Sequence, residues 1–384
     1  MNSSPKTSQQ IRKKTIKKAQ CVVVKVGTRV LTGDDGKLDR RRIDVLARGL
    51  CRIADTGRQV LLVSSGAVGA GLGKLGLEHR PSGLAQLQAI AAIGQADLIQ
   101  AYELSLAVHG RHAAQVLLTA ADLRRRSGYL HVRNALTQIH GFGSIAIINE
   151  NDTVAVAELK TTFGDNDRLA SQVAGLLVDS VLIILSDIEG LYDGPPDIPT
   201  SKRIDIVKEI DDEVFGFAHD KLSSSSKGGM ASKLRAAKLA TQHGHATFIA
   251  PGRNDDVLDK IMAGESIGTL FLPPKQTIRG RKRWIGAAAP VAGSLQLDSG
   301  AAKALTKHGK SLLAVGVTAV NGAFPAGSII ALLDPDGNEI ARGLCNYRSA
   351  HIVKIMGQPS DQIHDILGYC SYENVVHRNN MVLT

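Results

Sequence analysis

The densest group of chemically capable side chains lies in the segment 149–167, which directly follows the apolar run "SIAII". This segment, "NENDTVAVAELKTTFGDND", has eight carboxylate or amide side chains in nineteen residues, against one lysine. Short oxygen and amide groups of this kind hold a metal ion, bind an amine, or form a solvated turn. The cluster is unexpected in a chain whose net charge is +10, so we treat it as a candidate binding site.

Two lysines are placed where they could meet an anion. Lys25 lies inside the apolar run "VVVKVGT", just before Gly27. If this strand is buried on both faces, the ammonium group of Lys25 must project from the end of the strand. Lys233 closes the segment "SKGGMASK", which opens an amphipathic helix. Free N–H groups and the helix dipole favour phosphate at a helix N-terminus. Both patterns favour phosphate binding; a lysine that reaches an exposed surface and a plain helix start are the alternatives.

Small hydroxyl, glycine and acidic residues follow two further apolar runs. The segment "VSSGAVGAG", 63–71, comes after the second predicted strand, and its small residues would let backbone N–H groups approach an anion closely. An ordinary strand-to-helix loop is the alternative. Ser186 and Asp187 follow another apolar run, in "LSDIEGLYDGPP". They could form the wall of a nucleotide pocket, or simply a turn.

Three familiar patterns do not apply. The segment "GLGKLG", 71–76, matches G-x-G-x-x-G, but it lies eight residues past Val63 and no acid ends the next strand, so we predict a flexible loop there. No G-x-x-x-x-G-K-[ST] occurs, so any nucleotide must be held in another way. The histidine pairs His109/His112 and His243/His245 lack a partner set for a metal site, and none is predicted.

Short apolar runs alternate with amphipathic segments from Cys21 onward. We predict strands at 21–26, 59–63, 114–118, 144–148, 181–185 and 246–250, and helices at 39–56, 82–107, 129–140, 167–178 and 230–242. Strands that alternate with helices imply an α/β fold with a mostly parallel sheet sandwiched by helices. Ligands of such sheets bind beyond the carboxyl ends of the strands, where the polar motifs fall.

Towards the C-terminus, short apolar runs separated by turn signals replace the alternation of strands and helices. Residues 291–349 contain the short runs "SLQL", "SLLAVGV", "SIIALL" and "EIARGL", separated by the turn signals "NGAFPAG" and "DPDGN". We predict a small, mainly β domain over 291–384, joined to the rest by a linker over 275–290.

Composition and charge limit the classes of protein to which the chain can belong. Hydrophobic residues make up 43% and charged residues 21%, which is typical of a soluble globular chain. No apolar run approaches the length of a membrane span, and the four scattered cysteines predict free thiols in a reducing compartment, hence the cytoplasm. Residues 1–20 hold six basic residues and no acid, and predict a disordered, solvated tail; an RNA contact or a transit peptide is the alternative.

Taken together, the motifs resemble those of the glutamate 5-kinases, which belong to the amino-acid kinase family. The resemblance rests on Lys25-Val26-Gly27-Thr28, Ser64-Ser65-Gly66-Ala67, Asn149-Glu150-Asn151-Asp152, Gly164-Asp165-Asn166-Asp167, Ser186-Asp187 and Gly228-Gly229-Met230-Ala231-Ser232-Lys233, in this order. It implies an amino-acid kinase domain over 21–274. The remainder, with "RKRWI" and "ILGY" to "VVHR", is similar to a PUA domain.

The resemblance implies transfer of a phosphoryl group from ATP, with Mg²⁺ carried on its phosphates, to the side-chain carboxylate of L-glutamate. The implied catalytic residues are Lys25, Lys233 and Asp167, of which Asp167 holds the two ammonium groups. The implied glutamate-binding residues are Ser65, Gly66, Asp152 and Asn166, with Asn149 and Asp165 as further contributors. The implied nucleotide-binding residues are Lys25, Gly27, Ser186, Asp187, Lys227, Gly228, Gly229, Met230, Ala231, Ser232 and Lys233.

The resemblance also implies inhibition by proline, a homodimer or homotetramer, and hand-over of the product to glutamate-5-semialdehyde dehydrogenase. RNA binding by the PUA-like domain is a further hypothesis, although a net charge of +4 over residues 279–384 is a weak signature of an RNA-binding protein. The main alternative is a related kinase that acts on acetylglutamate, aspartate, carbamate or a nucleoside monophosphate. Two departures from the family pattern are Ser226-Lys227 in the phosphate loop and a longer loop at "KTTFGDND".

Overall fold

The computed structural model describes residues 5–124, 126–154, 165–218, 229–274 and 291–383. The chain divides into two compact units: residues 1–123 with 132–277, and residues 124–131 with 278–384. The predicted linker, 275–290, lies outside the described residues.

The first unit is built on a mostly parallel sheet. The strands are β1 (Cys21–Val26), β2 (Gln59–Ser64), β3 (Ala113–Leu118), β4 (Ile145–Glu150), β5 (Ser180–Ser186), β6 (Ile206–Val207), β7 (Ala246–Pro251) and β8 (Thr269–Phe271). Among the described residues they form one sheet of eight strands in the order β3-β4-β2-β1-β5-β7-β8-β6. Of the strand pairs that the structure describes in this sheet, only β7–β8 is antiparallel. The predicted parallel α/β fold is confirmed.

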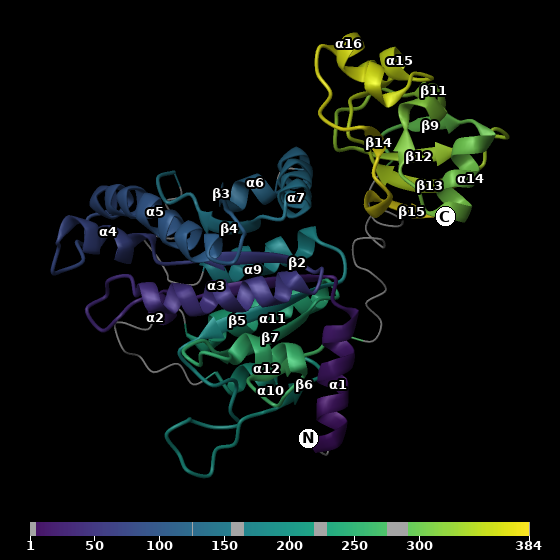
Figure 1. Cartoon of the computed structure of the whole chain (residues 1–384). Helices are drawn as coiled ribbons and strands as arrows, with labels where there is room; N and C mark the ends of the chain where they lie inside the picture. Colours follow the sequence, from purple (N-terminus) through teal and green to yellow (C-terminus); the bar gives the residue numbers. More distant parts are fainter. Residues whose placement is uncertain (1–4, 125, 155–164, 219–228, 275–290, 384) are drawn as a thin grey trace. The chain divides into compact units, whose positions relative to one another are not determined.

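The helices up to residue 263 cover both faces of this sheet (Figure 1). They are α1 (Pro5–Lys18), α2 (Thr28–Leu31), α3 (Arg40–Asp55), α4 (Ala67–Leu75), α5 (Leu84–Ala107), α6 (Ala120–Arg124), α7 (Arg126–Gly141), α9 (Asp165–Leu176), α10 (Asp212–Gly216), α11 (Met230–Gln242) and α12 (Val257–Ala263). None of the helices within the described ranges is both long and apolar enough to cross a membrane.

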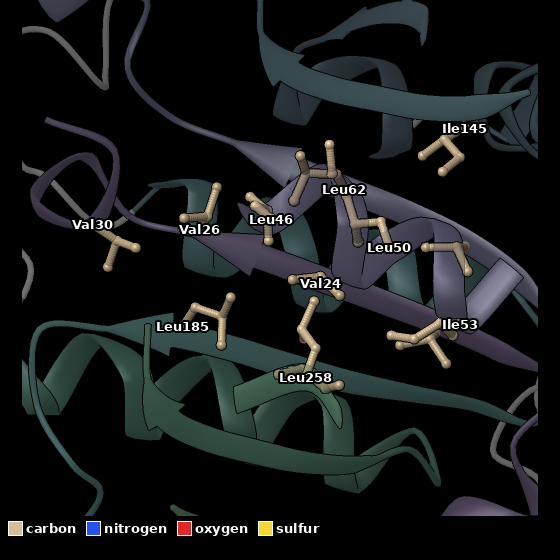
Figure 2. Packing of buried hydrophobic residues seen from close by; sticks show 14 of the residues in the cluster. Val24, Val26, Val30, Leu46, Leu50, Ile53, Leu62, Ile145, Leu185 and Leu258 are labelled. Atoms are coloured by element: carbon tan, nitrogen blue, oxygen red, sulfur yellow. The ribbon is translucent and has the colours of Figure 1, made fainter. Parts of the chain in front are cut away.

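Alternation along β1 separates a hydrophobic face from the face that carries Lys25. Val22, Val24 and Val26 belong to a buried cluster with residues of α3, α5 and α12. Figure 2 shows part of this cluster, with Val24 near Leu50 of α3 and Leu258 of α12. Each fully buried side chain of this size stabilises the fold by about 1.5–3 kcal/mol. On the other face, α9 contacts β1, β2, β4 and β5, and α11 packs against α9.

The strand register brings the polar motifs to one edge of the sheet. Val26 at the end of β1 is aligned with Ser64 of β2 and with Leu185 of β5. On the far side of β2, Ile148 of β4 is aligned with Val63. Strands that follow β1 in the chain lie on both sides of it, so the strand order reverses there, and this is where ligands of open α/β sheets bind.

The packing of α4 on α5 corrects the prediction of a flexible loop at 71–76. Residues 67–75 are helical, and Gly76 ends the helix in the left-handed conformation, with φ +64°. A Cβ atom on Gly94 of α5 would lie 1.9 Å from the carbonyl oxygen of Ala67, and one on Gly71 would lie 2.1 Å from that of Ile90. The glycines, which favour a loop by propensity, are needed here because the two helix backbones touch.

Gly94→Ala is expected to destabilise the first unit by about 1–3 kcal/mol, because the added methyl group must push α4 away from α5. Urea denaturation followed by circular dichroism would measure this loss. Gly141→Ala is the matched control, since a Cβ atom there meets no atom within 4 Å. Equal midpoints for the two variants would contradict the close-packing account.

The N-terminal segment corrects the prediction of a disordered tail. Residues 5–18 form α1, and the side chain of Arg12 is fully buried at 0% exposure. Its guanidinium donates to the carbonyl oxygens of Ile267 at 2.8 Å, Gly268 at 2.9 Å and Asp205 at 2.8 Å, and to the carboxylate of Asp205 at 2.5 Å. One of the basic residues of this segment, Arg12, is therefore buried, and it anchors α1 to the strands β6 and β8.

Arg12→Ala is expected to lower the free energy of unfolding by about 3 kcal/mol, because it removes the buried hydrogen bonds to three carbonyl groups and the positive charge that pairs with the Asp205 carboxylate. The thermal midpoint of the variant, compared with that of the exposed α1 variant Lys17→Ala, tests this. A midpoint that falls no further in Arg12→Ala than in Lys17→Ala would contradict the anchoring role.

The second unit is mainly β, as predicted. Its strands are β9 (Ser294–Leu297), β10 (Leu312–Leu313), β11 (Val317–Asn321), β12 (Ile329–Leu333), β13 (Glu339–Leu344), β14 (Asn374–Val376) and β15 (Met381–Leu383). The main sheet has the order β11-β9-β12-β13-β15, and β10 pairs with β14. Its helices are α14 (Ser299–His308), α15 (Ser349–Ile355) and α16 (Ile363–Leu367), with short 3₁₀ turns η2 (Ala314–Gly316), η3 (Ser360–Gln362) and η4 (Arg378–Asn380).

Candidate active site

A buried ion pair lies at the carboxyl end of β1. The ammonium nitrogen of Lys25 is 2.6 Å from Oδ1 of Asp167, and the two side chains are only 9% and 2% exposed. Asp167 is the third residue of α9, so the end of β1 and the start of α9 meet here. Gly27 leaves space beside the pair, since a Cβ atom there would lie 3.5 Å from the Lys25 nitrogen. The structure thus brings together two of the residues implied to be catalytic.

A network of amides lies on the β2 and β4 side of this pair. The amide nitrogen of Asn166 donates to Ser65 Oγ at 3.0 Å and to Asn149 Oδ1 at 3.2 Å. The amide nitrogen of Asn149 donates in turn to Gln95 Oε1 at 2.9 Å. Asn166 Oδ1 and Gln95 Nε2 are buried and have no hydrogen-bond partner among the residues that the structure describes. One orphaned acceptor and one orphaned donor suit a ligand that carries both an ammonium group and a carboxylate.

The remaining residues implied to bind glutamate lie around this network, as far as they are described. Gly66 precedes α4 with φ +106°, a conformation that favours glycine. Asp152 follows β4, and its carbonyl oxygen accepts a hydrogen bond from Gln88 Nε2 at 3.3 Å. Burial lowers the pKa of Arg80, and the charge of the nearby Asp152 opposes this shift. Asp165 begins α9, but its side chain lies outside the described part of the structure.

A second charged group lies at the carboxyl end of β5. Ser186 Oγ donates to Oδ1 of Asp187 at 2.9 Å, and Arg29 Nη1 donates to its Oδ2 at 2.9 Å. Burial alone would raise the pKa of Asp187, but these two hydrogen bonds and the charge of Lys233 outweigh it, and the pKa is lowered. Asp187 is therefore a carboxylate at neutral pH, with Lys233 in its electrostatic surroundings.

The start of α11 provides the other cation and a helix N-terminus. Gly229 precedes the helix, and Met230, Ala231, Ser232 and Lys233 form its first turn. The side chain of Lys233 is buried, and α11 packs against α9 and β7. Lys227 and Gly228, also implied to bind the nucleotide, lie outside the described residues. The positive end of the helix dipole at the start of α11, together with two buried lysines, fits a polyphosphate.

Sequence reasoning missed two residues of this arrangement. Gln95 is a polar residue on the buried side of the apolar helix α5, and that position was the available signal. Arg29 follows the "KVGT" motif directly, but its partner Asp187 is 158 positions away in the sequence, so no local pattern pairs them.

Comparison with known proteins places the chain in a family. The model of the amino-acid kinase family matches residues 20–251, and the model of the PUA domain matches residues 293–367. The glutamate 5-kinase of Rhodopirellula baltica is 61% identical over 384 residues, which cover 100% of this chain and 99% of that protein. The chain belongs to the glutamate 5-kinase family.

A second relative of the same family, the glutamate 5-kinase of Caldanaerobacter subterraneus, is 47% identical over 363 residues, covering 94% of this chain and 97% of that protein. The UMP kinase structure from Bacillus anthracis overlies 66% of this chain and 96% of that chain, with a TM-score of 0.47 and 14% identity. Family membership confirms the resemblance, the kinase class and the C-terminal PUA domain. The helix α1 lies before the matched range of the kinase model.

Proposed function

We propose that this member of the glutamate 5-kinase family transfers the γ-phosphoryl group of ATP to the side-chain carboxylate of L-glutamate. The products are γ-glutamyl phosphate and ADP, and the reaction is the first step of proline biosynthesis. The observation that carries the proposal is the buried Lys25–Asp167 pair. On one side of it lie Asn166 Oδ1 and Gln95 Nε2, which have no hydrogen-bond partner among the described residues, and on the other lies the charged group at Asp187.

The amide network supports a free amino acid as the substrate. Asn166 Oδ1 is a buried acceptor that an α-ammonium group would satisfy, and the carboxylate of Asp152 would neutralise its charge. Gln95 Nε2 and the N–H groups at the start of α4 would receive a carboxylate. Acetylglutamate has no α-ammonium group and would leave the acceptor unsatisfied, so it is the poorer substrate in this account.

The chemistry needs alignment and neutralisation of charge. A glutamate side chain has a pKa of about 4.3, so at neutral pH it is already the nucleophile and requires no general base. Lys25 and Lys233 would neutralise the charge of the phosphoryl group as it moves, and Asp167 would hold the ammonium group of Lys25 in position. Mg²⁺, when bound to the ATP phosphates, would neutralise part of their charge.

Several further properties belong to the same proposal. Proline shares the ammonium and α-carboxylate of glutamate, so it would compete for the amide network and inhibit at subsaturating glutamate. The acyl phosphate product is unstable in water, so a reductase of the glutamate-5-semialdehyde dehydrogenase type would consume it. We also propose, from the family, a homodimer or homotetramer in the cytoplasm; the four cysteines are free thiols, which suits a reducing compartment.

Trapping of the product tests the proposed reaction. Purified protein is incubated with ATP, Mg²⁺ and hydroxylamine, and with glutamate, aspartate or acetylglutamate in parallel, and the hydroxamate is measured with ferric ion. The proposal predicts hydroxamate with glutamate, and far less with the other two acids. An absence of γ-glutamyl hydroxamate from a folded protein that binds ATP would overturn it.

A further inference from the structure

The ion pair between Arg29 and Asp187 lies within the proposed nucleotide side of the site. Arg29 is the second residue of α2, which begins directly after Gly27 at the end of β1. Asp187 follows the last residue of β5, the strand next to β1, and Ser186 holds its other carboxylate oxygen. Arg29 Nη1 and Asp187 Oδ2 are 2.9 Å apart, and their side chains are 51% and 31% exposed.

A carboxylate at this place raises an electrostatic problem that Arg29 resolves. A bound nucleoside triphosphate carries several negative charges, and Asp187 would repel them if it were not neutralised. Hydrogen bonds and nearby positive charge keep Asp187 ionised, as its lowered pKa indicates. The guanidinium of Arg29 therefore supplies positive charge at the point where an incoming polyphosphate would otherwise meet a carboxylate.

The base of the Arg29 side chain is fixed while its end remains accessible. The backbone carbonyl of Arg29 accepts a hydrogen bond from Arg253 Nη2 at 2.9 Å, and the carbonyl of Thr32 lies 3.5 Å from the same nitrogen. The short helix α2 is therefore tied to the segment that follows β7. A half-exposed guanidinium on a fixed backbone can turn toward a phosphate oxygen without movement of the chain, while its charge stays beside Asp187.

We propose that Arg29 is a nucleotide-binding residue that neutralises Asp187 and donates to the phosphates of ATP and ADP when they bind. This inference rests on the proposed kinase function and adds a residue that sequence reasoning did not assign. Arginine suits the task because its planar donors match carboxylate and phosphate oxygens alike.

Arg29→Ala is expected to weaken binding of ADP and of a non-hydrolysable ATP analogue by about tenfold, since it removes one charge-assisted interaction with the phosphates. Binding of adenosine, which has no phosphate, is expected to be unchanged. Isothermal titration calorimetry without glutamate measures these affinities directly. Arg29→Lys retains the charge but not the planar donors, and is expected to recover part of the affinity.

Arg52→Ala is the matched control. Arg52 forms a similarly exposed ion pair with Asp259, and it lies in the last turn of α3, which leads to the amino-terminal ends of the strands. Its removal is expected to leave nucleotide affinity unchanged. Wild-type affinity for ADP in Arg29→Ala would overturn the inference, and so would an equal loss in Arg52→Ala. Failure of the wild type itself to bind ATP would instead contradict the proposed kinase function.

Discussion

Lys25→Met is expected to lower kcat for hydroxamate formation by about a thousandfold, as the loss of one preorganised charge in a buried site does in other enzymes. The ammonium group of Lys25 is 2.6 Å from Asp167 and almost fully buried, so it is held before any substrate arrives. The ammonium group therefore does not have to move or reorient when negative charge develops on the phosphoryl group during transfer. The effect is expected mainly in kcat, because the interaction is strongest in the transition state.

The same variant also leaves Asp167 as a buried, unpaired carboxylate, which would destabilise the fold by about 3–5 kcal/mol. The double variant Lys25→Met/Asp167→Asn separates the two effects, since it removes the unpaired charge. It is expected to recover much of the lost thermal stability and none of the lost activity. A double variant that regains wild-type kcat would contradict the catalytic role of Lys25.

Lys233→Met is expected to lower kcat by about 100- to 1,000-fold and to raise the KM for ATP, while the KM for glutamate stays close to that of the wild type. Lys233 is buried in the first turn of α11, and its charge contributes to the lowered pKa of Asp187. It thus lies on the nucleotide side of the proposed site, away from the amide network. Steady-state kinetics with each substrate varied in turn would separate these parameters.

Arg235→Ala on the same helix is the control for Lys233→Met, because Arg235 is an exposed cation two residues further along α11. Its removal is expected to leave kcat and both KM values within about twofold of the wild type, as for most surface substitutions. A kcat for Lys233→Met that is as high as that for Arg235→Ala would show that α11 contributes no catalytic charge.

The sheet and its helices were predictable where local pattern and tertiary packing agree. The segment 230–242 was predicted as a helix and is the helix α11, and "SLQL" and "EIARGL" are the strands β9 and β13. The helix α9 begins at Asp165, two residues before the predicted start, so Asn166 and Asp167 lie in its first turn. That shift matters, because a helical first turn directs these side chains at β1 and β2.

The errors have a common cause in contacts between distant segments. The burial of Arg12 depends on carbonyl groups more than 190 residues away, and a basic sequence cannot show them. The helix α4 depends on the backbone of α5 at Gly94, which offsets the low helix propensity of its glycines. The pairing of Asn149 with Gln95 and of Arg29 with Asp187 likewise arises only once the strands are aligned.

The central claim is that a side-chain carboxylate oxygen attacks the γ-phosphorus of ATP. It is tested most directly with glutamate labelled by ¹⁸O at both side-chain carboxylate oxygens, in the presence of ATP, Mg²⁺ and hydroxylamine. Hydroxylamine attacks the acyl carbon, so the phosphate that leaves carries the bridging oxygen. The account predicts one ¹⁸O in the released phosphate and one in the hydroxamate, read by ³¹P NMR and mass spectrometry. Phosphate without ¹⁸O would contradict it, because the phosphoryl group would then have gone to water.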